Sequence, residues 1–488
     1  MNKILFIASE AYPLIKTGGL GDVAGSLPQA LLKRKQDVRV LLPGYRSVLA
    51  QIKQPTLVAE IIHYVQKIRL IETTLPNSYV KTWVVDCPAA FDRPGNPYIN
   101  SDGVNWPDNA FRFALFCQVA VEVALNRCNL NWQPDLVHCN DWQTALVPAL
   151  LDCYVQRPAT VFTIHNLAYQ GLFDQQTFNT LGLPSVLWHP GGVEFYDQFS
   201  FIKGGLVYAD FINTVSPRYA KEIQQAEFGY GLDGLLRHRS GVLRGILNGI
   251  DHDIWNPAND LHLHYRYNQK TLKNKSLNKT ELQTALKLPV AANIPMLGMI
   301  SRMVEQKGFD TVIGALTELV QLDIQMVFLG NGQSYFEKAL SAWAKQYPRQ
   351  IHVRIGYDET LSHRIEAAAD LYLMPSLFEP CGLNQLYSLR YGTLPIVRNV
   401  GGLADSVCDT NEITITNNTA TGFVMTDNKP ATLVTAVQRA LAYYQQPSLW
   451  RQLQVNAMNQ DFSWQHSAGA YLQMYQDAIA ANPKTGLR

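Results

Sequence analysis

The strongest constraint on the fold is an alternation, along the whole chain, of short apolar runs with longer stretches of helical period. Short, near-continuous apolar runs are typical of strands buried on both faces, and helices between them predict a parallel sheet covered on both sides. The strands expected in the first half are residues 4–8, 38–42, 83–85, 136–138, 160–164 and 211–215. The first half is therefore predicted to form an α/β domain.

The same pattern restarts in the second half, after a connection at residues 248–257 that contains Gly, Asn and Pro. Each series opens with a strand followed by a loop that holds Lys and Gly, first Lys16-Thr17-Gly18-Gly19 and then Lys307-Gly308. The strands expected in the second half are residues 296–300, 324–329, 353–355, 371–374 and 394–397. We expect two doubly wound, Rossmann-like α/β domains that face each other across a deep cleft, with ligands at the carboxyl ends of the strands.

Helical period predicts three helices, near each end of the chain and in its middle. Asp22 is expected to cap a helix whose apolar face includes Val23 and Leu27. Residues 463–481 are expected to form a terminal helix. The cluster of lysines at positions 270, 273, 275 and 279 predicts a solvated helix face.

Residues 93–109 have no clear period and are rich in Gly, Pro, Asn and aromatic side chains. A loop of this length is often functional. We therefore expect a long loop here that contributes to a site.

Charge and cysteine content narrow the class of protein. The 41 Lys and Arg residues against 40 Asp and Glu give a net charge of +1, which argues against a nucleic-acid partner. A hydrophobic share of 47% excludes intrinsic disorder. The seven cysteines are odd in number and form no CxxC pair, which favours reduced thiols. Because no apolar run has the length of a membrane span or a signal-peptide core, we expect a cytoplasmic protein with no membrane partner.

The first glycine-rich loop is open to several interpretations. Gly19-Leu20-Gly21-Asp22-Val23-Ala24 matches the dinucleotide fingerprint GxGxxA. The preceding strand ends too early, however, and the next one lacks the acidic residue that would hold a ribose. The glycines then either make a tight turn or form a phosphate cradle, in which backbone N–H groups bind an anion and Lys16 adds a charge. No GxxxxGK[ST] is present, which excludes a P-loop nucleoside triphosphatase.

Two motifs resemble metal-binding sites, but neither predicts one. Asp251-His252-Asp253 matches the DxD signature for a metal-bound nucleotide, but it follows a turn in the connection rather than a strand, and we interpret it as structural. His262 and His264 have no further ligands at suitable spacing. No metal site is predicted.

The second half carries the clearest chemistry. Arg302 and Lys307 lie on the loop after its first strand, where they are either solvated charges or two cations that hold a diphosphate. Cations placed where negative charge develops on a leaving group are a large catalytic term. Glu379, in the motif Glu-Pro-Cys-Gly-Leu, is placed to contact a neutral polar ligand such as sugar hydroxyls, and Gly401-Gly402 closes a further turn.

Taken together, these motifs resemble those of the bacterial glycogen synthases, a family shared with plant starch synthases. The motifs that carry the resemblance run in family order: Lys16-Thr-Gly-Gly-Leu-Gly-Asp-Val23, Asn140-Asp-Trp142, Thr163-Ile-His-Asn166, Tyr230-Gly-Leu-Asp-Gly234, Asn248-Gly-Ile-Asp251, Arg302 to Gly308, Glu379-Pro-Cys-Gly-Leu383 and Gly401-Gly-Leu403. The resemblance implies a GT-B fold and retaining transfer of glucose from ADP-glucose to the non-reducing end of an α-1,4-glucan. It also implies that neither a metal nor a covalently bound cofactor is needed.

The resemblance assigns roles to individual positions. The group implied as catalytic is Lys16, His165, Arg302, Lys307 and Glu379. Within it, Arg302 and Lys307 hold the diphosphate, Glu379 binds the donor glucose, and His165 lies beneath the reacting sugar. The further donor-binding positions are Gly18, Gly19, Asp22, Asn248, Tyr357, Cys381, Gly382 and Leu383, with Tyr357 stacking on adenine.

On the acceptor side the resemblance assigns Glu10, Tyr98, Asp141 and Trp142. It also implies domains at residues 1–247 and 248–460, and a C-terminal helix at 461–488 that crosses back to the first domain. The family's front-side attack and a double displacement both remain open, although no carboxylate pair suited to double displacement is evident. Departures from the family pattern, such as Asn384 and Gln143, affect the acceptor geometry rather than the cations.

Two rival functions remain on the same architecture. The first is a catalytically silent α-glucan-binding protein, against which the intact set of cations, histidine and carboxylate argues. The second is an α-glucan phosphorylase, but such chains are usually much longer and carry a lysine-bound pyridoxal phosphate. The oligomeric state does not follow from the sequence.

Overall fold

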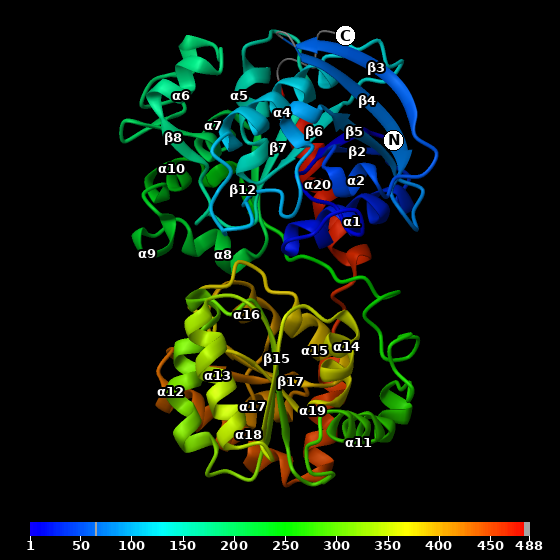
Figure 1. The fold of residues 1–488 in the computed structure, drawn as a ribbon, viewed down its shortest axis with the longest axis vertical. Coiled ribbons are helices and arrows are strands. Elements are labelled where there is room, and N and C mark those ends of the chain that lie inside the picture. Colours follow the sequence, from blue (N-terminus) through cyan, green and yellow to red (C-terminus); the bar gives the residue numbers. More distant parts are fainter. Residues whose placement is uncertain (64–65, 483–488) are drawn as a thin grey trace. The chain divides into compact units, whose positions relative to one another are not determined.

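The computed structural model describes residues 1–63 and 66–482. The chain divides into two compact units: Met1–Gly249 joined by the residues from Trp464 onward, and Ile250–Ser463. Each unit contains its own main sheet, largely or wholly parallel, and its own helical layers (Figure 1).

The first unit is built on a nine-stranded sheet in the order β12-β11-β7-β6-β1-β2-β5-β4-β3. The central strand of this sheet is β1, which pairs in parallel with β2 on one side and with β6 on the other. Residues 4–7 of β1 are fully buried. The strand bounds are β1 Lys3–Ile7, β2 Asp37–Pro43, β3 Thr56–His63, β4 Gln66–Thr74, β5 Lys81–Asp86, β6 Leu136–Asn140, β7 Ala159–Ile164, β11 Phe211–Thr214 and β12 Leu243–Gly245. The chain reverses its direction of winding between β1 and β6, so the loops after these strands flank the crossover point where open α/β sheets bind ligands.

One part of this sheet departs from the expected pattern. β3 and β4 form an antiparallel hairpin, and β4 also pairs antiparallel with β5, so the sheet is mixed rather than wholly parallel. A small separate sheet, β8 Leu172–Asp174, β9 Glu194–Phe195 and β10 Gln198–Ser200, was also not predicted. β8 and β10 contain exposed polar residues and β9 has only two residues, so the three strands lack the apolar runs by which the other strands were identified.

The helices of the first unit cover the sheet. Their bounds are α1 Gly19–Lys33, α2 Arg46–Leu49, α3 Pro88–Phe91, α4 Asn109–Ala124, α5 Leu146–Asp152, α6 Gln175–Thr180, α7 Phe201–Tyr208, α8 Pro217–Glu222, α9 Ala226–Gly229, α10 Asp233–His238 and α20 Trp464–Ala481, with short 3₁₀ turns at Trp142–Thr144, Ser185–Leu187 and Ser240–Val242. In α1 the predicted apolar face is buried, including Val23 and Leu27. The predicted cap is wrong, because Gly18 occupies the N-cap position and Asp22 lies inside the first turn.

The last helix, α20 (red in Figure 1), packs against β6, β7 and α1 of the first unit. Its two buried tyrosines reach the sheet: Tyr475 Oη lies 2.7 Å from His138 Nδ1, and Tyr471 Oη accepts a hydrogen bond of 3.1 Å from Asn213. The terminal helix predicted from helical period is confirmed.

The second unit has a six-stranded sheet in the order β15-β14-β13-β16-β17-β18, and every pairing is parallel. The strand bounds are β13 Met296–Ile300, β14 Gln325–Gly330, β15 Ile351–Ile355, β16 Leu371–Met374, β17 Leu394–Arg398 and β18 Phe423–Met425. Only the short β18 was not predicted. The order is that of a doubly wound fold whose crossover point lies between β13 and β16.

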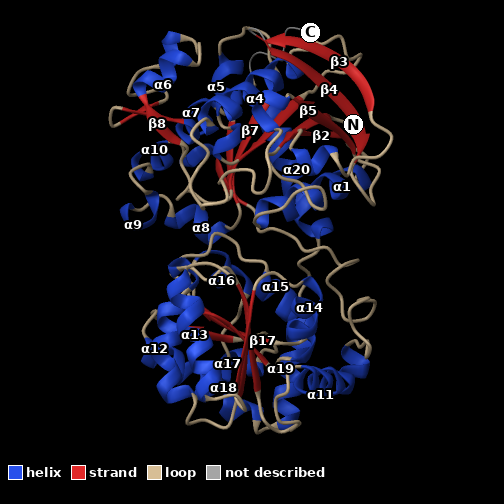
Figure 2. Ribbon diagram, viewed as in Figure 1, coloured by secondary structure: helices blue, strands red, loops and turns tan. Residues whose placement is uncertain are grey.

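Helices cover both faces of this second sheet, with α12 and α13 on one face and α11 and α14 on the other (Figure 2). The bounds are α11 Lys275–Ala285, α12 Phe309–Leu319, α13 Ser334–Gln346, α14 Glu359–Ala368, α15 Asn384–Tyr391, α16 Gly401–Ser406, α17 Glu412–Thr416, α18 Pro430–Tyr444 and α19 Pro447–Met458, with 3₁₀ turns at Gln269–Asn274 and Glu305–Lys307. The predicted two-sided covering of a parallel sheet is confirmed in this unit.

The solvated lysine face predicted around α11 is wrong for two of its four residues. Lys270 and Lys273 are exposed, but Lys275 and Lys279 are buried. Lys279 Nζ lies 2.7 Å from Asp370, and Lys275 donates to Thr393 and to two backbone carbonyls at the end of α14. Long lysine stems can cross an apolar layer to reach such partners, which a count of charges along the sequence does not reveal.

Two further expectations are met by the described residues. All seven cysteines are free thiols. Across residues 1–63 and 66–482, no helix is both long enough and apolar enough to cross a membrane.

Candidate active site

In the first unit, Glu10 organises the glycine-rich loop. It follows β1 and is buried, and its carboxylate accepts hydrogen bonds from the Thr17 backbone N–H, the Thr17 hydroxyl and the Gly18 backbone N–H. Tyr98, from the predicted long loop, donates to the same carboxylate at 2.6 Å. The structure thus brings two of the expected acceptor-side residues together and connects them to the glycine-rich loop.

Lys16 lies at the start of this loop, and its ammonium group forms an ion pair of 2.8 Å with Asp22 in the first turn of α1. Both side chains are partly exposed. Gly18 has open space where a side chain would begin, so an anion can approach the N-terminus of α1 closely. The loop therefore has the charge and the room required of a phosphate cradle.

At the ends of β6 and β7, beside the same crossover point, Asn140 and Asp141 contact His165. His165 Nε2 lies 3.0 Å from Asn140 Oδ1, and the His165 backbone N–H donates to Asp141 Oδ1 at 2.7 Å. Burial lowers the pKa of His165 to about 3, so its imidazole is uncharged at neutral pH. Burial likewise raises the pKa of Asp141 to about 7.

Trp142 and Asn248 complete the candidate residues of the first unit. Trp142 packs edge-on against Phe113 and Phe201, with ring centroids 5.1 and 5.6 Å away. Asn248 is buried, and its Oδ1 has no hydrogen-bond partner among the described residues. A buried amide oxygen without a partner is a strong candidate for a ligand contact.

In the second unit, the crossover point joins a cation and a carboxylate. Lys307 follows β13, and Glu379 follows the neighbouring β16. Lys307 Nζ lies 2.6 Å from Glu379 Oε2, which also accepts from the Ser376 hydroxyl at 3.0 Å. Both side chains are largely buried, so the pair is held in a fixed position at the strand ends. The sequence motifs point to Lys307 and Glu379, but no motif points to Ser376.

Glycine is required beside Glu379 because two backbone segments almost touch. A Cβ at Gly401 would lie 1.9 Å from the Glu379 carbonyl oxygen, and φ at Gly401 is +45°. A Cβ at Gly402 would lie 2.1 Å from the carbonyl oxygen of Cys381. The Gly402 N–H also donates to the Glu379 carbonyl at 3.0 Å, so the predicted turn holds the Glu379 segment in place.

The remaining candidates differ in their surroundings. Arg302 is exposed, and no described residue pairs with its guanidinium. Tyr357 is 75% exposed and donates to Glu359, which leaves its ring faces accessible. Cys381 is buried, Gly382 has a positive φ of 72°, and Leu383 precedes the first residue of α15.

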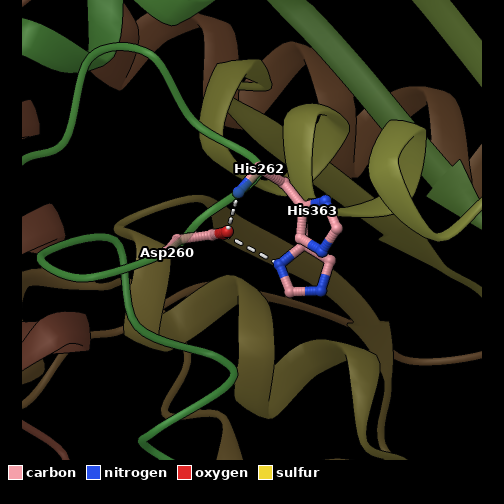
Figure 3. A group of neighbouring side chains, drawn as sticks. All are labelled: Asp260, His262 and His363. Carbon is pink, nitrogen blue, oxygen red and sulfur yellow. Dashed lines mark hydrogen bonds and ion pairs between the residues drawn. The ribbon is translucent and has the colours of Figure 1, made fainter.

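In the triplet Asp251-His252-Asp253, Asp251 Oδ1 accepts from the backbone N–H of Asp253 at 2.8 Å and closes a turn. A different cluster lies nearby, where atoms of Asp260, His262 and His363 that could bind a metal all lie within 4.8 Å of one another (Figure 3). His363 Nδ1 lies 2.8 Å from Asp260 Oδ2, which also accepts from the Tyr391 hydroxyl. Trp255 stacks on the His363 ring at 3.9 Å.

We interpret this cluster as an ion pair. Burial lowers the pKa of His363, but hydrogen bonds to Asp260 and Glu359 outweigh this effect and raise the pKa to about 9. The imidazolium therefore donates to Asp260, in agreement with the lowered pKa of that carboxyl group. An imidazolium has no lone pair for a metal, and its charge lies over the face of Trp255.

This ion pair predicts a pH-dependent stability. Because the pKa of His363 is about 9 in the folded chain and about 6.5 when unfolded, its stabilisation is complete below pH 6.5 and is lost as the pH rises through 9. The difference corresponds to about 3 kcal/mol. We expect thermal melts of the wild type to approach those of His363→Gln between pH 6.5 and 9.5. His264→Gln, which changes an exposed histidine, is the control, and a constant gap between wild type and His363→Gln would contradict the interpretation.

Family models match parts of both units. The family model described as starch synthase catalytic domain matches residues 3–238, and the one described as glycosyl transferases group 1 matches residues 286–453. The catalytic domain of starch synthase IV from Arabidopsis thaliana, solved bound to ADP and acarbose, aligns with a TM-score of 0.88 at 32% identity, over 98% of this chain and 99% of that one.

The two doubly wound units, together with these matches, show that the chain is a glycosyltransferase of the GT-B fold. The glycogen synthase of Cellvibrio japonicus is 54% identical over 97% of this chain and 99% of that protein. Glycogen synthase 1 of Methylococcus capsulatus is 53% identical over 98% and 97%. The chain belongs to the bacterial glycogen synthase family.

Proposed function

We propose that the chain transfers glucose from ADP-glucose to the non-reducing end of an α-1,4-glucan, with retention of the anomeric configuration. The observation that carries the proposal is the Lys307–Glu379 pair at the crossover point of the second sheet. A cation beside a carboxylate suits a ligand that is anionic at one end and rich in hydroxyls at the other, as a sugar nucleotide is. The ADP and acarbose in the related starch synthase structure support the same donor and acceptor classes.

Each unit is proposed to offer donor-binding residues of its own. In the second unit, Lys307 and Arg302 are suited to bind the diphosphate, and in the first unit Lys16 and the N-terminus of α1 are suited to bind a phosphate. Glu379 binds hydroxyls of the transferred glucose, next to the backbone of residues 381–383. Asn248 offers its buried amide oxygen to the donor, and the exposed ring of Tyr357 stacks on the adenine.

The acceptor is proposed to bind near the first unit's crossover point. Trp142 offers an aromatic ring for the apolar face of a glucose unit, while Asp141 and the Glu10–Tyr98 pair provide polar contacts. Glu10 also holds the glycine-rich loop, and Asp141 holds the His165 backbone. Binding of the acceptor is therefore expected to affect the position of the glycine-rich loop and of His165.

Catalysis follows from charge. Positive charge develops at the transferred sugar while the diphosphate leaves with additional negative charge, so the three cations stabilise the departing oxygens. The uncharged His165 does not repel the developing positive centre. Because side chains supply these cations, we expect a chelator to leave the rate unchanged.

A comparison of two donors tests the proposal. We expect the initial rate on a glycogen primer to be at least tenfold higher with ADP-glucose than with UDP-glucose, because the donors differ only in the base that Tyr357 contacts. Equal rates would overturn the donor assignment. Glycogen binding without turnover of either donor would instead favour a catalytically silent glucan-binding protein.

A further inference from the structure

Asn140 is the last residue of β6, and its side chain reaches the imidazole of His165 beyond the end of β7. The strand is central, paired in parallel with β1 and β7, and Asn140 is fully buried. Asn140 Oδ1 lies 3.0 Å from His165 Nε2. The imidazole is therefore held by a side chain on a rigid strand.

The orientation of the Asn140 amide follows from its other contacts. Its Nδ2 group donates to the backbone carbonyl of Ile7 at 3.0 Å and lies 3.4 Å from that of His138. Both partners are carbonyl oxygens, which can only accept, so the NH₂ group must face them. The amide oxygen must then face His165.

This arrangement determines which nitrogen of His165 carries the proton. An amide oxygen only accepts, so Nε2 must hold the hydrogen and Nδ1 keeps its lone pair. His138, on the same strand, shows the contrast: its two ring nitrogens face the hydroxyls of Tyr475 and Thr163, and each hydroxyl can donate or accept. The surroundings of His138 therefore leave its tautomer open, whereas those of His165 do not.

The next residue holds the backbone of His165. Asp141 adopts φ 56° and ψ 179°, a conformation that costs a non-glycine residue strain energy. In this conformation its carboxylate accepts the His165 N–H at 2.7 Å. Consecutive residues at the end of one strand thus fix the ring and the backbone of the same histidine.

We propose that Asn140 is a positioning residue that holds His165 in the neutral tautomer protonated at Nε2, with Nδ1 as its only hydrogen-bond acceptor. The inference rests on the proposed function, in which His165 lies beneath the transferred sugar. In this state the ring can accept a hydrogen bond from a substrate but cannot donate a proton to it from Nδ1. It also places no positive charge beside the centre at which positive charge develops.

Nitrogen NMR of the full chain with ¹⁵N-labelled histidine tests this directly, with the His165 signals assigned by comparison with His165→Ala. In the enzyme without substrate we expect the Nε2 signal of His165 to have the shift of a protonated ring nitrogen and the Nδ1 signal that of an unprotonated one. Protonation at Nδ1, or an imidazolium at neutral pH, would overturn the inference whatever the enzyme's activity.

Variants connect the tautomer to catalysis. We expect Asn140→Leu, which removes the acceptor, to shift the His165 nitrogen signals towards a mixture of tautomers and to lower kcat by up to about 100-fold, with KM for the donor changed much less. Asn140→Asp keeps an acceptor oxygen and should preserve a protonated Nε2, but it removes the NH₂ group that donates to the Ile7 carbonyl and should lower stability.

Asn213→Leu is the matched control, because Asn213 is also a buried amide of this sheet but bonds Thr163 and Tyr471 rather than His165. It should lower stability without changing the His165 signals. Equal changes in the His165 signals from Asn140→Leu and Asn213→Leu would reduce Asn140 to a structural role. A confirmed tautomer in a protein that turns over no sugar nucleotide would contradict the proposed function and leave the assignment of the proton intact.

Discussion

Replacing Lys307 with alanine is expected to lower kcat by about 10²–10³-fold, the loss typical when one preorganised group that stabilises a leaving oxygen is removed. Lys307 Nζ lies 2.6 Å from Glu379 and is largely buried, so the ammonium group is already in place before the donor binds. Its removal also leaves the Glu379 carboxylate beside the diphosphate without its cation. Initial rates with ADP-glucose measure the effect.

Two further variants serve as controls for Lys307→Ala. Lys429→Ala removes an exposed lysine of the same unit whose pair with Asp427 spans 3.5 Å, and it should leave the rate unchanged. Lys307→Arg keeps the charge but changes the shape of the donor group, so it should retain part of the activity. A normal rate in a folded Lys307→Ala protein would remove the lysine from the mechanism.

Replacing Gly401 with alanine is expected to abolish most of the activity without touching a charged group. The new Cβ would lie 1.9 Å from the Glu379 carbonyl oxygen, so the backbone segment that carries Glu379 must move. The φ of +45° adds strain for any residue other than glycine. A shift of about 1 Å at a reacting site costs on the order of 100-fold in rate.

Controls must distinguish displacement of the Glu379 segment in Gly401→Ala from unfolding of the protein. Gly241→Ala is the control, because a Cβ at Gly241 meets no atom within 4 Å, and it should preserve both stability and rate. Urea unfolding of Gly401→Ala should show that the second unit still folds cooperatively. A folded Gly401→Ala protein with wild-type KM and kcat would show that the Glu379 segment tolerates displacement.

The sequence predicts the central strands of both sheets because those strands are apolar on both faces. β1 and β13 are each an almost unbroken run of large apolar residues, and the loops that follow carry the predicted lysines. The pairing of Lys307 with Glu379 was not predictable in the same way. It depends on β13 and β16 being neighbours at the crossover point, although 72 positions separate the two residues along the chain.

Polar residues with more than one possible partner account for the errors and omissions. Asp22 has the residue type of a helix cap, but an ion pair with Lys16 occupies its carboxylate inside the helix. Lys275 and Lys279 have the residue type of a solvated face, yet polar groups across the layer bind them. Glu10 was assigned only through the family resemblance, and Asn140 appeared only as part of a family motif, because their partners come from other strands and loops.

The position of α20 has a consequence for biosynthesis. The first unit needs Tyr471 and Tyr475 to cover its sheet, and these residues leave the ribosome after the whole of the second unit. The second unit, whose segment is continuous, can fold as soon as it emerges, whereas the unit translated first must wait with β6 and β7 uncovered. The part of the enzyme made first is thus the last to be completed, and nascent chains truncated before Trp464 should depend on chaperones.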